Sequence, residues 1–190
     1  MTTAAQPTIG VGDVLAVYSP GIGAELIRLG AALENKPNLS NHVAIVHHKD
    51  AQGRWWVIQG QPGGVGYAQA APLLSSSHTI DNVLQPGRSD TDRALLARRA
   101  ESMLGTPYDW EAIADEVVRT FAPRAKNIWE QNWQGTGLAP GHVICSSFAA
   151  YLYKSAGWAY PRDVDTREIS PGDWDEFCIE NSYNAKARTT

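Results

Sequence analysis

Alternation of short apolar runs with turn residues predicts an antiparallel sheet in the first half of the chain. The runs are rich in Val, Ile and Trp and are bounded by Gly, Asn and Asp, which is typical of strands joined by turns. The expected strands are Val14–Tyr18, Val43–His47, Trp55–Gln59 and Thr79–Leu84. Asp50–Gly53 has the composition of a hairpin turn, and Gly60–Gly64 has that of a second turn.

A change to helical spacing predicts helices between and after these strands. Ser89–Asp92 has the pattern of a capping box, and the helix that follows is expected to end at Leu104–Gly105. Further helices are expected from Pro20 (Ile22, Leu26, Leu29 and Leu33 on one face), from Thr106 (Ile113 and Val117 on one face) and from Cys145 to Gly157. Ser170–Trp174 is expected to form a late turn or a single helical turn.

The order of these elements favours one α+β domain over residues 1–190. Strands and helices are mixed without the regular alternation that builds a parallel sheet. Residues 122–141 contain two Pro and three Gly and are expected to form a long loop. Residues 1–10 and 181–190 are expected to be a loose leader and a loose tail.

Composition and charge narrow the class of protein. The chain is 43% hydrophobic and 19% charged, which is typical of a globular domain. Its net charge of −4 argues against a nucleic-acid binder, because such proteins usually carry a basic face. The start of the sequence lacks the regions of a signal peptide, and no apolar run approaches the ~20 residues of a transmembrane span. We therefore expect cytoplasmic synthesis, with lysis or packaging in a phage virion as the route if the protein acts outside the cell; the oligomeric state stays open.

Cys145 is the first candidate for chemistry. It stands at the first turn of a largely apolar helix, where the positive end of the helix dipole favours thiolate over thiol. The alternative is an inert packing cysteine, since Phe148 and Leu152 give the helix a buried face. A disulfide with Cys178 is disfavoured, because a domain of this size does not need one.

A nucleophilic thiol needs a base and a group that orients the base. His42 heads an apolar strand, and Gln59, at the end of the next strand, is the best polar residue to orient its ring. The other four histidines, His47, His48, His78 and His142, are competitors for the role of base. A zinc site is disfavoured, because His42 and His47 fall on opposite faces of a strand and no HExxH or CxxC is present.

Five segments, taken in chain order, resemble the papain-like hydrolases of the NlpC superfamily in their circularly permuted branch. They are Gly12–Leu15, Ser40–Val46, Val57–Gln59 followed by Gly64 and Val65, Gly105–Asp109, and Cys145–Phe148 with Gly157, followed by Ile169–Asp173. The superfamily's ordinary order places the cysteine helix before the histidine strand, whereas here His42 comes first. The resemblance covers about residues 10–178, and the joint order of the motifs is more specific than any one of them.

The resemblance implies a papain-like fold in which an antiparallel sheet packs against the nucleophile helix. By the resemblance, Cys145 is the nucleophile and His42 the general base, and Gln59 stands where the family often has an orienting Glu. Tyr108 and Ser146 are the implied substrate-binding or oxyanion residues. No cofactor and no metal is implied.

The resemblance also implies a cysteine peptidase or amidase that hydrolyses amide bonds, with a bacterial cell-wall peptide or a peptidoglycan-like molecule as substrate. Two alternatives remain. One is a lipid-directed acyltransferase or thioesterase of the same fold, in which Leu26, Leu29 and Leu33 line an acyl site. The other is a non-catalytic virion or wall-binding module, suggested by Gln59 in place of Glu.

Overall fold

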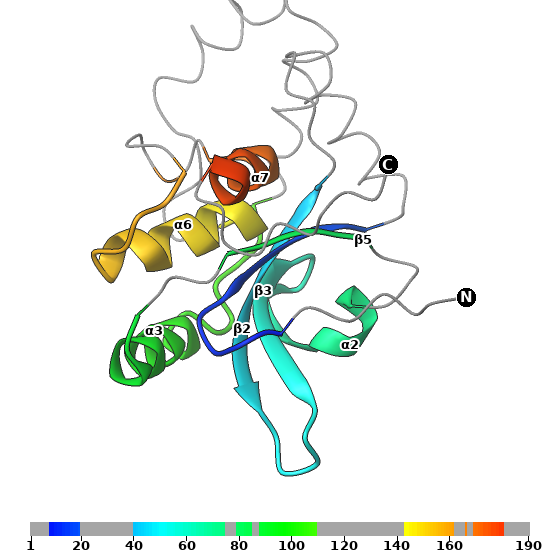
Figure 1. The fold of residues 1–190 in the computed structure, drawn as a ribbon, viewed down its shortest axis with the longest axis vertical. Coiled ribbons are helices and arrows are strands. Elements are labelled where there is room, and N and C mark those ends of the chain that lie inside the picture. The colour runs from blue at the N-terminus through cyan, green and yellow to red at the C-terminus, as the bar shows by residue number, and fades with distance from the viewer. Residues whose placement is uncertain are drawn as a thin grey trace, which may run out of the picture.

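The computed structural model describes residues 8–19, 40–74, 79–84, 88–109, 143–161, 166 and 169–180. These residues form an α+β fold with a five-stranded antiparallel sheet in the order β4-β3-β2-β1-β5 (Figure 1). The strands are β1 (Val14–Tyr18), β2 (His42–Lys49), β3 (Trp55–Gln61), β4 (Gly64–Gln69) and β5 (Thr79–Leu84). The helices are α2 (Ala70–Leu73), α3 (Asp90–Glu101), α6 (Cys145–Ser155) and α7 (Pro171–Glu180).

All four predicted strands are confirmed, but β4 was not expected. β3 continues to Gln61, through the first part of the predicted Gly60–Gly64 turn, and β4 begins at Gly64. The two glycines in β4 hide its strand pattern, and other groups approach both of them closely. An added Cβ would lie 2.7 Å from the Thr106 carbonyl oxygen at Gly64 and 2.9 Å from the Gln61 amide at Gly66.

The helix predicted after Ser89 is confirmed as α3, and the prediction of a short turn near Ser170 is wrong. Ser89 accepts a hydrogen bond from the backbone N–H of Asp92, as the capping box predicts. At Ser170, a similar reciprocal cap with Asp173 starts the ten-residue helix α7. Pro171 at its first position fits a helix start as well as a turn, which is why the pattern was ambiguous.

The core lies on both faces of the sheet. One cluster joins α3, α6 and α7 to the sheet through residues such as Leu96, Phe148 and Trp174. The smaller cluster joins α2 to the other face through Ala70 and Leu73. Figure 1 shows α3 and α6 on one side of the strands and α2 on the other. The helix that begins with Cys145, α6, therefore packs on the sheet, against β2 and β3.

Several expectations fall outside the described residues: the helix from Pro20, the helix body after residue 109, the loop 122–141, most of the leader and the 181–190 tail. Among the helices that the structure describes, none has the length and hydropathy to cross a membrane.

Candidate active site

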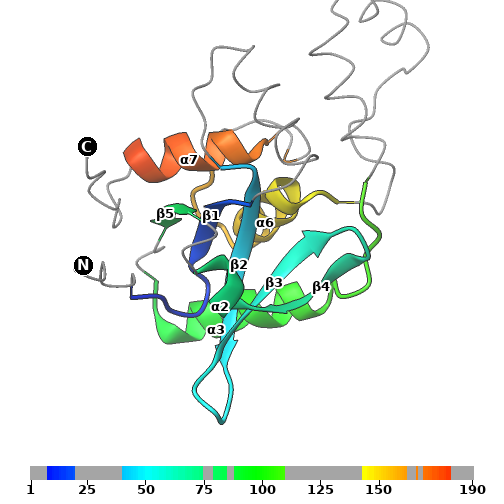
Figure 2. The ribbon, with the colours of Figure 1, turned by 90° about the vertical axis from the view of Figure 1, so that its right-hand side faces the viewer.

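The candidate site lies where β2 and β3 separate. The ladder between them ends at the Ile45–Ile58 pair. Beyond it, β2 continues along β1 as far as His42, and β3 continues along β4 as far as Gln61. Figure 2 shows the two strands diverging on the side of α6. We call this split end of the sheet the fork.

The N-terminus of α6 is held in the fork by both strands. On the β3 side, an added Cβ at Gly60 would lie 3.1 Å from the Cys145 nitrogen and 3.2 Å from the Ile144 carbonyl carbon, so the helix backbone rests directly on this glycine. On the β2 side, the backbone N–H of Val43 donates a hydrogen bond to the Cys145 sulfur. Only a residue without a side chain allows so close an approach at position 60.

Cys145, His42 and Gln59 meet in the fork. The Cys145 thiol is hydrogen-bonded to the His42 imidazole, and the imidazole Nε2 lies 2.7 Å from the Gln59 amide oxygen Oε1. An amide oxygen only accepts, so Nε2 carries a hydrogen and donates it. Nδ1 is then the ring nitrogen left for the thiol, which fixes the imidazole in the tautomer that can accept the thiol proton.

The surroundings of this pair favour the thiolate and imidazolium forms. Burial raises the pKa of the Cys145 thiol, but the His42 charge, the His42 hydrogen bond and the N–H groups of Val43 and Ser146 outweigh it, so the pKa is lowered overall. Burial lowers the pKa of His42, but the charge and hydrogen bond of Cys145 and the hydrogen bond of Gln59 outweigh it, so the pKa is raised overall. Opposite shifts of this kind are typical of a thiolate–imidazolium pair.

Tyr108 is brought to the site by a short backbone bridge. It pairs in parallel with Val143, and the flanking hydrogen bonds join Asp109 N to Val143 O and Val143 N to Pro107 O, each 3.1 Å long. Burial, then the charges of Cys145 and Asp109, raise the pKa of the Tyr108 phenol. Tyr108 is therefore a neutral hydroxyl that lies close enough to Cys145 to respond to its charge.

The side chain of Ser146, one of the two predicted substrate-binding or oxyanion residues, is engaged outside the fork. Its hydroxyl is buried and donates to the Ile169 carbonyl oxygen at 2.6 Å, while its own carbonyl accepts from the Trp174 indole at 3.1 Å. These bonds attach the start of α6 to Ile169, just before α7, and to Trp174 within α7. Only the backbone N–H of Ser146 reaches the site, where it donates to the Cys145 sulfur.

Ser147 caps α6, the helix that begins with Cys145. The backbone N–H of Ile144 donates to the Ser147 hydroxyl at 3.0 Å, and that hydroxyl donates to the Ile144 carbonyl at 3.1 Å. This short cap fixes the backbone of Ile144, the residue before Cys145, and thereby the direction in which the Cys145 side chain points. The N-cap residue is Ile144 rather than Ser, Thr, Asp or Asn, so the sequence carries no capping-box signal for this cap.

The competing histidines that the structure describes belong to a different cluster. His47 Nδ1 lies 2.8 Å from His48 Nδ1, and His47 Nε2 lies 3.2 Å from the Ala97 carbonyl oxygen. Tyr67 packs edge-on against both rings and donates to Glu101. His78 and His142 fall outside the described residues. In the part of the chain that the structure describes, no group of three or more His, Cys, Asp or Glu is arranged to hold a metal ion.

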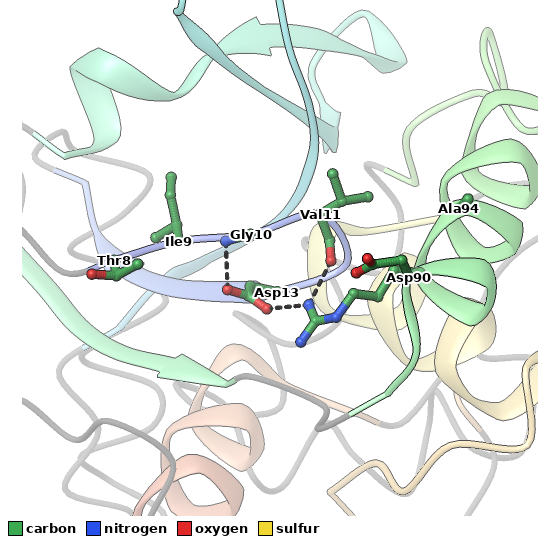
Figure 3. Close-up of a pocket in the computed structure, with 8 residues that line it drawn as sticks. Thr8, Ile9, Gly10, Val11, Asp13, Asp90 and Ala94 are labelled. Atoms are coloured by element: carbon green, nitrogen blue, oxygen red, sulfur yellow. Dashed lines mark hydrogen bonds and ion pairs between the residues drawn. The ribbon is translucent and has the colours of Figure 1, made fainter.

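A cavity of about 470 Å³ lies beside the loop before β1 and shares no residue with the fork (Figure 3). The Asp13 carboxylate on its wall accepts hydrogen bonds from Gly10 N at 2.8 Å and from Arg93 Nη1 at 2.7 Å. Arg93 also donates to the Val11 carbonyl at 2.6 Å. The ion pair braces the Gly12–Leu15 segment against α3, which gives this family-like motif a structural role.

Two residues of the site were missed from the sequence. Gly60 was assigned to a turn, although it is the point of contact with α6. Gln61 accepts a hydrogen bond from the Gln59 amide at 3.1 Å. Its spacing of two from Gln59 in a strand places both on one face, which was the available signal.

The sequence matches no protein-family model and no curated protein. Among solved structures it is similar to the crystal structure of the metalloprotein yiiX from Escherichia coli O157:H7, a DUF1105 protein, with a TM-score of 0.52 and 18% identity. The match covers 80% of this chain and 67% of that chain. At this identity, the likeness shows a shared fold alone.

Proposed function

We propose that this protein is a cysteine-dependent amide hydrolase with a circularly permuted papain-like fold. The observation that carries the proposal is the line of hydrogen bonds from Cys145 through His42 to Gln59 at the N-terminus of α6. A nucleophile, a base and a group that orients the base are the three parts that thiol catalysis requires. The order of His42 before Cys145 is that of the permuted branch.

The reaction begins with attack of the Cys145 thiolate on the amide carbonyl carbon, which forms a C–S bond and a tetrahedral oxyanion. The His42 imidazolium gives its proton to the leaving nitrogen as the C–N bond breaks, and a thioester remains. Water then attacks the thioester carbon while His42 accepts a proton from it. The C–S bond breaks and the carboxylic acid leaves, which restores the Cys145 thiolate beside the His42 imidazolium.

The oxyanion is stabilised by the first turn of α6 and by Tyr108. Backbone N–H groups at a helix start have no partner within the helix, and the dipole makes this end positive. The N–H of Cys145, the first residue of α6, is the donor that we assign to the oxyanion. Tyr108, kept neutral because burial and nearby negative charge raise its pKa, has a proton to donate to the same oxygen.

The substrate class we propose is a bacterial cell-wall peptide. The support is the resemblance to the NlpC superfamily, in which such peptides are the commonest substrates. An acidic protein is suited to a peptide rather than to a nucleic acid, as the net charge of −4 indicates.

Purified peptidoglycan fragments incubated with the protein test the proposal. The wild type is expected to release new amine and carboxyl termini, which mass spectrometry of the fragments detects. Cys145→Ala and Cys145→Ser are expected to lose this activity, since neither forms a thiolate. Cys178→Ala is the matched control, because Cys178 is also a buried free thiol. Cleavage by Cys145→Ala at the wild-type rate would disprove the proposed mechanism.

The same experiment addresses the two alternatives. The lipid-directed acyltransferase or thioesterase predicts a stable mass increase on Cys145 with an acyl donor and no effect on wall fragments. The non-catalytic module predicts binding to wall fragments without new termini. Leu26, Leu29 and Leu33, on which the lipid-directed alternative depends, fall outside the described residues.

A further inference from the structure

The amide of Gln59 has a partner on each side. Its oxygen Oε1 lies 2.7 Å from His42 Nε2, and its nitrogen Nε2 donates to the Gln61 oxygen Oε1 at 3.1 Å. Gln59 and Gln61 lie two apart on β3 and therefore on one face. The series of hydrogen bonds that runs from Cys145 through His42 to Gln59 thus extends to a fourth residue, Gln61.

A glutamine in this position carries a risk that a carboxylate does not. The oxygen and nitrogen ends of its amide have nearly the same size, but only the oxygen accepts the N–H of His42. With the amide reversed, two N–H donors would face each other, and the imidazolium would lose its support. A carboxylate has two acceptor oxygens, so that either orientation works.

Gly66 provides the space that lets Gln61 reach back to Gln59. Gly66 pairs with Gln59 across the β3–β4 ladder, and an added Cβ there would lie 2.9 Å from the Gln61 amide nitrogen. A side chain at position 66 would therefore displace Gln61 from its place beside Gln59. The backbone of Gly66 is not in the left-handed region, so this space is the reason for the glycine.

We infer that Gln61 is a positioning residue that accepts the Gln59 amide N–H and thereby keeps the amide oxygen on His42. The need for it follows from the glutamine at position 59, where the resembling family often has Glu. The inference deepens the proposed function, since it concerns how the same Cys145–His42 pair is kept active.

The test measures the rate of iodoacetamide alkylation of Cys145 against pH, followed by mass spectrometry of the peptide that carries it. Gln61→Met keeps the size of the side chain but removes the acceptor. It is expected to raise the midpoint of the wild-type profile by about half a pH unit or more, which is roughly a threefold loss of rate below the midpoint. Gln61→Glu, which only accepts, is expected to leave the midpoint at or below the wild-type value.

Two further comparisons separate positioning from general stability. Gly66→Ala is expected to shift the midpoint as Gln61→Met does, whereas Gly63→Ala, whose Cβ meets no atom within 4 Å, is expected to leave it unchanged. In a Gln59→Glu background, Gln61→Met is expected to have little effect, because a carboxylate needs no fixed orientation. A merely structural role would give the same Gln61→Met effect in both backgrounds.

The outcomes distinguish this inference from the proposed function. A low wild-type midpoint that Gln61→Met does not move would overturn the inference and leave the proposed function intact. The predicted shifts together with no cleavage of wall fragments would support the inference and overturn the function. A wild-type profile equal to that of a free thiol would overturn both.

Discussion

The two cysteines of this chain lie in comparable burial but in opposite chemical surroundings. Cys145 is 4% exposed and Cys178 is 0% exposed, and both are free thiols. The pKa of Cys145 is lowered, because the charge and hydrogen bond of His42 and two backbone N–H groups outweigh burial. The pKa of Cys178 is raised, first by burial and then by the Asp175 charge.

The difference teaches that burial by itself does not decide the pKa of a thiol. Cys178 lies within α7, where the nearby Asp175 carboxylate adds to the effect of burial on its pKa. Cys145 lies at the first turn of α6, in the fork, where donors from both strands and from its own helix converge. Reactivity therefore follows from the position of the cysteine on its helix and from what the sheet presents to it.

The largest expected effect is a difference in alkylation between the two thiols of the native protein. At pH 6.5 we expect iodoacetamide to modify Cys145 at least ~100-fold faster than Cys178, since each unit of pKa changes the thiolate fraction about tenfold below the pKa. Peptide mass spectrometry after a timed quench measures both sites. Equal rates at the two cysteines would remove the distinction on which the proposed active site depends.

Loss of His42 should remove most of this difference. In His42→Ala, burial acts on the Cys145 thiol without its main opposing group, so the pKa rises and less thiolate forms at a given pH. We expect alkylation at pH 6.5 to fall at least ~10-fold, with a midpoint displaced to higher pH. His48→Ala, on the same strand but in the His47 cluster, is the control and should leave the midpoint in place.

Gly60→Ala should act on the fork itself. Its Cβ would press on the backbone of Ile144 and Cys145 at 3.1–3.2 Å, and backbone atoms cannot yield as a side-chain tip does. We expect a loss of about 1–3 kcal/mol in the free energy of unfolding, measured in urea, together with slower alkylation of Cys145. Gly63→Ala provides the unstrained comparison, and identical behaviour of the two variants would argue against the close contact.

The smallest effect is expected from Asp175→Asn. Asp175 accepts hydrogen bonds from the Ser40 N–H at 2.9 Å and from the Ser40 hydroxyl, and an amide oxygen can accept both. The change removes a charge that raises the Cys178 pKa, but burial is the larger cause, so Cys178 should stay unmodified in the native state. The free energy of unfolding should fall by about 1 kcal/mol or less. Rapid native labelling of Cys178 would show that Asp175, rather than burial, keeps it inert.

Patterns local in the sequence predicted most of the described fold. Strand alternation located β1, β2, β3 and β5, and Ser89 marked the start of α3. β4 was missed because it contains Gly64 and Gly66, which are closely approached by Thr106, some forty residues away, and by Gln61 on the facing strand β3. In the sequence, a strand glycine that makes room for a neighbouring group cannot be distinguished from a glycine in a turn.

The site was predicted in part for the same reason. Cys145 and His42 were identifiable because each begins a regular element, and Gln59 because it ends the apolar run of a strand, although that strand continues to Gln61. The hydrogen bonds of Ser146 and Gln61 depend on which atom of each side chain faces its partner. The spacing of residues along the sequence does not predict that orientation. The separation of β2 from β3 is likewise a property of the assembled sheet.

The fork has a consequence for the newly synthesised chain. His42 and Cys145 are separated by roughly a hundred residues, so that their contact is among the least local in the fold and closes only when sheet and helix have assembled. Until then Cys145 is an ordinary thiol, no more reactive toward neighbouring proteins than any other. Completion of the fold is therefore itself the event that lowers the pKa of this thiol.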